Sequence, residues 1–141
     1  MSEEYEAFAK KMEEQYPKMF ENKYGGFAVG KGWWPILEAL CANIQSHIDW
    51  REKQGAAIPQ VIVEQIKEKF GGLRFYYQGG DEQIHGMVRM AEAWAANCCE
   101  ECCAPGIRRN GGWIRTLCDQ HEAEHQERLR TREMKSSGFE E

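Results

Sequence analysis

Cysteine crowding within positions 98–103 constrains the fold of this chain more than any other feature of the sequence. The four residues are Cys98, Cys99, Cys102 and Cys103, and Cys41 and Cys118 bring the total to six in 141 residues. The chain begins Met1-Ser2-Glu3-Glu4, which lacks the basic start and apolar stretch of a secretory signal, so we expect a cytoplasmic protein. Because cytoplasmic thiols stay reduced, crowded cysteines predict metal binding rather than disulfides.

Four potential ligands have the spacing of a tetrahedral zinc site. They are Cys99-x2-Cys102 and, after fifteen intervening residues, Cys118-x2-His121. A two-residue gap lets a tight turn direct both thiolates at one ion, and the second pair can complete the set from the first turn of a helix. Turn signals at Pro105-Gly106 and Asn110-Gly111 separate the pairs. The order of knuckle, hairpin and helix predicts a treble-clef-like zinc finger with a structural Zn²⁺ ion, which would help this apolar-poor segment to fold.

Neighbouring residues leave other ligand sets open. Cys98 and Cys103 flank the preferred pair and could substitute for it, and His125 could replace Cys118 or His121. Cys99 and Cys102 are preferred because only they give the two-residue gap. We expect Cys98 to end the core of the preceding helix.

A second zinc pattern, His121-Glu122-Ala123-Glu124-His125, matches the His-Glu-x-x-His motif of metalloproteases. Catalytic zinc keeps one coordination position open for water, whereas the cysteine-rich set fills all four. The protease is therefore an alternative hypothesis and not the leading one.

Hydrophobic periodicity predicts an α+β domain over residues 1–97, made of three helices and a small antiparallel sheet. The helices are expected over 2–15, 35–54 and 81–97, and the strands are joined through 70–72, although 64–69 has a helical composition. The segment 22–32 indicates an irregular loop or a short edge strand. A zinc module over 98–135 follows, with a helix from Cys118, and 136–141 is expected to be a flexible tail.

Some side chains can be assigned to core or surface by pattern. Cys41 lies on the apolar face of its helix and is expected in the core, whereas His47 and His85 are expected on helix surfaces. The core is expected to contain Trp33, Trp34, Trp94 and Trp113, with Phe75 and Tyr77. Tyr76 points opposite its strand neighbours and is expected to be an exposed anchor for a partner.

The charge distribution bears on possible partners. The formal net charge is −5, which disfavours a mainly electrostatic grip on nucleic acid. Residues 99–135 carry seven acidic and seven basic residues, so the module itself is neutral. Its arginines could contact phosphates, but we expect them to pair with Glu124, Glu127 and Glu133 at helical spacing. The arginines are Arg108, Arg109, Arg115, Arg128, Arg130 and Arg132. No apolar run approaches the roughly 20 residues of a membrane span.

Several segments between Trp33 and His121 resemble a family of small uncharacterised proteins from bacteriophages and prophages. These segments are Gly32-Trp33-Trp34-Pro35-Ile36-Leu37, Lys67-Glu68-Lys69-Phe70-Gly71-Gly72-Leu73-Arg74-Phe75-Tyr76 and Gly112-Trp113-Ile114-Arg115-Thr116-Leu117-Cys118-Asp119-Gln120-His121. The family's Cys-x-x-Cys-Gly-x-Pro-Gly aligns with Cys99-Glu100-Glu101-Cys102-Cys103-Ala104-Pro105-Gly106. The resemblance therefore implies that Cys99 and Cys102 are ligands, that Cys103 replaces a glycine, and that the protein has a phage origin.

The sequence thus predicts a non-enzymatic, zinc-stabilised interaction protein, encoded by a phage and acting on a host protein. A nucleic-acid-binding zinc finger and the metalloprotease are the alternatives. No catalytic residue is assigned, and no membrane partner is expected.

Overall fold

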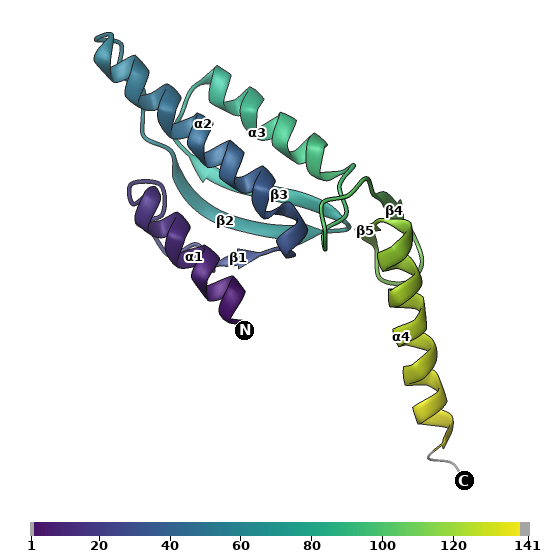
Figure 1. The fold of residues 1–141 in the computed structure, drawn as a ribbon. Coiled ribbons are helices and arrows are strands. Elements are labelled where there is room, and N and C mark those ends of the chain that lie inside the picture. The colour runs from purple at the N-terminus through teal and green to yellow at the C-terminus, as the bar shows by residue number, and fades with distance from the viewer. Residues whose placement is uncertain (1, 139–141) are drawn as a thin grey trace.

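The computed structural model describes residues 2–138 and shows a mixed α+β fold. Its helices are α1 (Glu3–Gln15), α2 (Trp34–Lys53), α3 (Glu82–Ala95) and α4 (Asp119–Gly138), with a 3₁₀ turn η1 (Lys31–Trp33) before α2. Its strands are β1 (Phe27–Ala28), β2 (Ile62–Lys69), β3 (Gly72–Gln78), β4 (Ile107–Arg109) and β5 (Arg115–Leu117). Figure 1 shows α1 to α3 and the larger sheet as one body, with α4 pointing away from it. The fourth helix is the one that belongs to the C-terminal module.

Sequence signals at the helix ends have the structural roles that they predict. The Ser2 side chain accepts a hydrogen bond from the Tyr5 backbone N–H and caps α1, and Asp81 caps α3 through the Ile84 N–H. Pro35 lies in the first turn of α2, and Gly55 follows its C-cap with φ +76°.

The larger sheet has the order β1-β2-β3. β2 and β3 pair antiparallel, with Ile66 opposite Phe75, so the ambiguous segment 64–69 is a strand. Ile66 is buried on the face of the sheet that packs against the helices. This burial explains why segment 64–69 forms a strand despite its helical composition. β1 pairs parallel to β2, so the prediction of a wholly antiparallel sheet is wrong at this short edge strand. The crossover that parallel pairing needs is supplied by α2.

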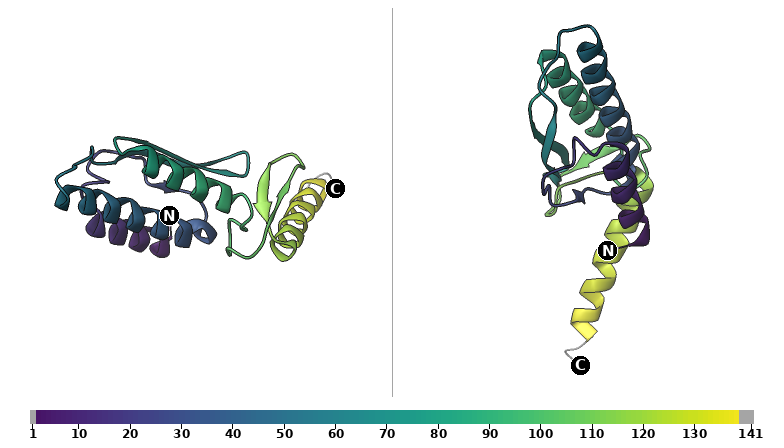
Figure 2. Two further views of the ribbon diagram at one scale, coloured as in Figure 1. Left: turned by 90° about the horizontal axis from the view of Figure 1, so that it is seen from above. Right: turned by 90° about the vertical axis from the view of Figure 1, so that its left-hand side faces the viewer.

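The hydrophobic core lies between one face of this sheet and the helices. Figure 2 shows α1, α2 and α3 on the same side of the sheet, and no helix of the described residues covers the opposite face. Buried residues include Phe8, Met12, Phe27, Trp33, Ile36, Leu37, Leu40, Cys41, Ile44, Ile66, Leu73, Phe75, Ile84 and Val88. The predicted core position of Cys41 is confirmed, and burial raises the pKa of its thiol.

Three predictions about single side chains are wrong. Trp94 and Trp113 are 46% and 66% exposed rather than in the core. His47 is buried rather than on the surface of α2, because its Nε2 hydrogen-bonds the Asp81 carboxylate at 2.9 Å. Tyr76, by contrast, is exposed as its strand position predicts.

The C-terminal module consists of a knuckle over residues 98–106, the antiparallel pair β4–β5 and α4. Because α4 continues to Gly138, the predicted tail 136–141 begins within that helix, and residues 139–141 lie outside the described part. None of the helices in residues 2–138 combines the length and apolarity needed to cross a bilayer.

Candidate metal centre

The structure brings the side chains of Cys99, Cys102, Cys118 and His121 into one cluster. Their four ligand atoms all lie within 4.8 Å of one another. Cys99 is buried, Cys102 is exposed, and the other two are half-buried, so the cluster has one solvent-facing side. No disulfide joins these thiols, which leaves them available to a cation.

The distances within this cluster fit a tetrahedral ion. Zn–S bonds of about 2.3 Å and Zn–N bonds of about 2.0–2.1 Å give tetrahedral edges of about 3.8 Å between two sulfurs and about 3.6 Å between sulfur and nitrogen. The Sγ atoms of Cys102 and Cys118 are 3.8 Å apart, and Cys99 Sγ lies 3.6 Å from His121 Nδ1. Cys118 Sγ is somewhat closer to His121 Nδ1, at 3.2 Å. The donor set and its dimensions therefore suit a metal that prefers thiolate and imidazole.

Backbone hydrogen bonds shape the knuckle that carries the first cysteine pair. The Cys103 N–H donates to the Cys99 carbonyl oxygen at 2.8 Å, and the Cys99 N–H donates to the Ala104 carbonyl at 2.7 Å. Cys103 has φ +69°, a left-handed conformation that favours glycine, which gives a physical reason for the glycine that the sequence resemblance implies there. A Cβ at Gly106 would lie 2.7 Å from the Cys99 nitrogen, so the return of the chain also requires glycine.

The second ligand pair lies at the start of α4. The His121 backbone N–H points at Cys118 Sγ, 3.4 Å away, and this hydrogen bond lowers the pKa of the Cys118 thiol. Arg109 of β4 donates to the Leu117 carbonyl oxygen at 3.0 Å and to the Asp119 carboxylate at 2.9 Å. The hairpin therefore holds the first turn of α4 in the orientation that directs both ligands inward.

The knuckle is seated directly on the α+β body. The Gly32 N–H donates to the Glu100 carbonyl oxygen at 2.9 Å, and a Cβ at Gly32 would lie only 2.3 Å from the Cys99 carbonyl oxygen. Beside it, the buried indole N–H of Trp33 donates to the Cys98 carbonyl oxygen at 3.0 Å. The Gly32-Trp33 motif therefore positions the first cysteine pair, and any side chain at residue 32 would force the two parts of the protein apart.

A buried carboxylate, Glu100, joins the knuckle to β5. It accepts hydrogen bonds from the Thr116 N–H at 3.0 Å and from Arg115 Nε at 3.1 Å. Burial raises its pKa even though both donors favour the charged form. Thr116 in turn donates its hydroxyl to the carbonyl oxygen of Gly71, at the tip of the β2–β3 hairpin, at 2.6 Å.

The neighbouring candidate ligands lie outside the cluster. Cys98 is buried in the core of the body, and Cys103 packs against that core. His125 is buried with its ring edge-on to Trp113, 6.2 Å between centroids, and is not among the four clustered residues. The two histidines of the His-Glu-x-x-His pattern therefore do not share a metal site, and this geometry gives the metalloprotease no support.

Most module arginines pair with carboxylates, but mainly across elements. Arg128 lies 3.8 Å from Glu101, and Arg109 and Arg115 form the pairs described above. Among the described residues, Arg130 is the only arginine that pairs within α4, with Glu127, as the helical spacing predicts.

Sequence reasoning missed the residues that support the ligands. Gly32, Trp33, Gly71, Glu100 and Thr116 are scattered along the chain and meet only in the fold. The one signal that pointed to them was the resemblance, because its segments converge on this site.

No family model, curated protein or solved structure matches this chain.

Proposed function

We propose that the protein is a non-enzymatic interaction protein whose C-terminal module is a treble-clef-like finger organised by one structural zinc ion. Cys99, Cys102, Cys118 and His121 would bind the ion and fill all four positions, which leaves none for a water nucleophile. The order of knuckle, β4–β5 hairpin and α4, with two ligands at each end, supports the treble-clef assignment. When bound, the zinc would cross-link the knuckle to the start of α4.

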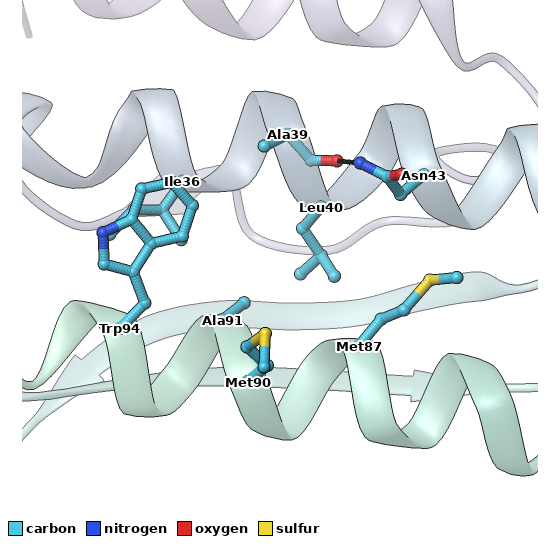
Figure 3. Close-up of a pocket in the computed structure, with 8 residues that line it drawn as sticks. All are labelled: Ile36, Ala39, Leu40, Asn43, Met87, Met90, Ala91 and Trp94. Carbon is cyan, nitrogen blue, oxygen red and sulfur yellow. Dashed lines mark hydrogen bonds between the residues drawn. The ribbon is translucent and has the colours of Figure 1, made fainter.

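The observation that carries the interaction role is an uncharged groove between α2 and α3. Figure 3 shows its eight lining residues. They are Ile36, Ala39, Leu40 and Asn43 of α2 with Met87, Met90, Ala91 and Trp94 of α3. The groove has a volume of about 300 Å³, and its rim side chains Met90 and Trp94 are 72% and 46% exposed.

The composition of this groove indicates what fills it. Each wall spans eight residues of helix, about 10 Å from the first to the last, or two turns. No charged side chain lines it, so the complementary surface is apolar, and a partner helix presenting side chains at i, i+3 or i+4, and i+7 matches its length. Methionine adapts its shape readily to such a partner, and tryptophan contributes strongly at interface centres. The resemblance to phage and prophage proteins suggests a host protein as the partner.

The interaction proposal is tested by affinity capture from host lysate with a variant and a matched control. Met90→Glu places a charge at the groove, whereas Arg89→Glu changes the exposed neighbouring position of the same helix. We expect capture by wild type and Arg89→Glu and loss of capture by Met90→Glu, with all three equally folded. A captured protein is then reduced to its helical segment, whose binding in calorimetry should show a negative heat-capacity change. Equal capture by Met90→Glu would contradict the groove proposal.

The zinc proposal is tested by chelation followed by readdition of metal. We expect a strong chelator to unfold the module and change the fluorescence of Trp113, and Zn²⁺ to restore it. A module that keeps its structure and stability without metal would contradict it.

A further inference from the structure

The uncovered face of the larger sheet carries cations that have no acidic partner. Lys67 of β2 lies directly opposite Arg74 of β3, an arrangement of like charges that costs stability rather than adding it. Lys69 follows on the same edge of β2. Among the residues that the structure describes, none of these three has a carboxylate oxygen within 4.0 Å, although the chain holds 23 acidic residues. Within the described residues, these three cations therefore form no ion pair that would stabilise the fold, although the protein as a whole is acidic.

Exposed aromatic rings accompany these cations. The Lys67 ammonium lies 5.7 Å from the ring centroid of Tyr76, which is 40% exposed. The Lys69 ammonium lies 5.8 Å from the ring of Phe70, which is 61% exposed at the tip of the hairpin. A basic group and an accessible flat ring are thus repeated along β2–β3.

Phe70 is an unfavourable residue for its position in the fold. Its φ of +53° lies in the left-handed region, where glycine or asparagine is favoured and a bulky side chain is strained. Because its ring is mostly exposed to solvent, hydrophobic burial contributes little free energy to offset this backbone strain. A role outside the folded chain explains why phenylalanine stands there.

A third pair continues the series onto the metal module. Arg115 lies 5.2 Å from the ring centroid of Trp113, which is 66% exposed. The backbone of Arg115 packs against Gly71, next to Phe70, and Thr116 hydrogen-bonds the Gly71 carbonyl. Trp113 therefore precedes by two residues a segment that contacts the hairpin tip, and the proposed zinc ion would hold that segment in place.

We propose that the exposed rings of Tyr76, Phe70 and Trp113, together with the cations Lys67, Lys69 and Arg74, form a binding surface for single-stranded nucleic acid. Unpaired bases stack on exposed aromatic rings, and the adjacent cations neutralise phosphates. Cations alone would be sufficient to bind an acidic peptide. The exposed flat rings are therefore better explained by stacking with nucleic-acid bases. The net charge of −5 and the small number of cations disfavour duplex binding, which depends on many phosphate contacts. This surface is built from other residues than the α2–α3 groove.

The test measures fluorescence anisotropy of a labelled oligonucleotide of about 12 nucleotides, within the range that small single-strand-binding surfaces cover. The full zinc-loaded chain is titrated at low salt with single-stranded and duplex probes. We expect preference for the single strand, and affinity that falls about 20-fold between about 50 and about 200 mM salt if three phosphates are neutralised.

Phe70→Asn is the decisive variant, because asparagine tolerates the left-handed backbone and should leave the fold intact. Loss of one stacking ring should weaken single-strand binding by at least about 5-fold. Trp50→Ala removes another exposed tryptophan, at the far end of α2, and should leave binding unchanged. Lys67→Ala should weaken binding and reduce its salt dependence, whereas Lys53→Ala should do neither.

Several results would overturn the proposal. They are no binding at low salt, equal binding by Phe70→Asn, equal affinity for poly-glutamate, or loss of binding only with Arg128→Ala plus Arg132→Ala. The poly-glutamate result would assign the surface to an acidic protein, and the arginine result would assign binding to α4.

Discussion

The indole nitrogen of Trp33 lies 3.0 Å from the carbonyl oxygen of Cys98, and both residues are buried at the junction between the α+β body and the metal module. One hydrogen bond thus links the turn before α2 to the residue preceding the first ligand, 65 positions later in the chain. The position of the cysteine knuckle therefore depends on contacts with the α+β body.

Trp33→Phe tests this junction. The variant keeps an aromatic ring but leaves the buried Cys98 carbonyl without its donor, so we expect a loss of about 1–3 kcal/mol in the free energy of unfolding. Denaturant titration of the zinc-loaded protein measures the change. Trp50→Phe, at an exposed position, is the control and should be within about 0.5 kcal/mol of wild type. Equal stability of the two variants would contradict the role of the Trp33 bond.

Gly32→Ala tests the close approach of body and knuckle. The added Cβ would stand 2.3 Å from the Cys99 carbonyl oxygen, so the backbone must move and the first ligand pair with it. We expect weaker zinc retention against a competing chelator and lower thermal stability. Gly111→Ala meets no atom within 4 Å and should behave as wild type. If both variants retain zinc equally, the close contact between Gly32 and the knuckle does not position the ligands.

Glu100→Ala tests the buried ion pair beneath the site. The Arg115 side chain is only 15% exposed, and the change leaves its charge without the Glu100 partner. We expect a loss of about 3–5 kcal/mol in unfolding free energy, as for other broken buried pairs. Glu101→Ala removes the neighbouring, more exposed carboxylate and should cost about 1 kcal/mol or less. Chemical denaturation of both variants gives the comparison, and similar losses would contradict the prediction.

The Asp81 carboxylate should contribute to the decline in the unfolding free energy of the α+β body at low pH. The hydrogen bond from His47, the Ile84 N–H and the charge of Arg51 hold its pKa below the ordinary value of 3.8. A carboxylate with a lowered folded-state pKa stabilises the protein above its unfolded-state pKa, and this contribution is lost as pH falls through the folded value. Asp81→Asn should therefore lessen the decline in unfolding free energy below about pH 4. Identical pH profiles of the two proteins, measured by denaturation without metal, would exclude this linkage.

Local patterns were sufficient to predict the helices, the β2–β3 hairpin and the four clustered ligands. Caps, apolar periodicity and ligand spacing are all encoded within a few residues, as at Asp81 and at Cys118 with His121. The parallel pairing of β1, the burial of His47 and the exposure of Trp113 were not predictable in this way. Each depends on a distant segment. β1 pairs with β2, His47 is hydrogen-bonded to Asp81, and the position of Trp113 is set by the β4–β5 hairpin and α4.

The same distinction applies to the residues around the candidate metal centre. The spacing of the cysteines identified Cys99 and Cys102. No local sequence pattern predicts that Gly32 contacts them or that Glu100 is a buried carboxylate. Glu100 and Glu101 are adjacent and chemically identical, and only the fold buries the first beneath β5 and leaves the second half-buried near Arg115 and Arg128.

Elemental analysis of the purified chain tests the central proposal most directly, with Cys102→Ser and Cys103→Ser measured beside wild type. Wild type and Cys103→Ser should each contain about one zinc per chain, and Cys102→Ser should contain much less because it lacks one of four ligands. Cys103 is the matched control, since it adjoins the knuckle but packs against the core. A wild-type protein without zinc, or loss of zinc with Cys103→Ser but not with Cys102→Ser, would contradict a zinc site formed by Cys99, Cys102, Cys118 and His121.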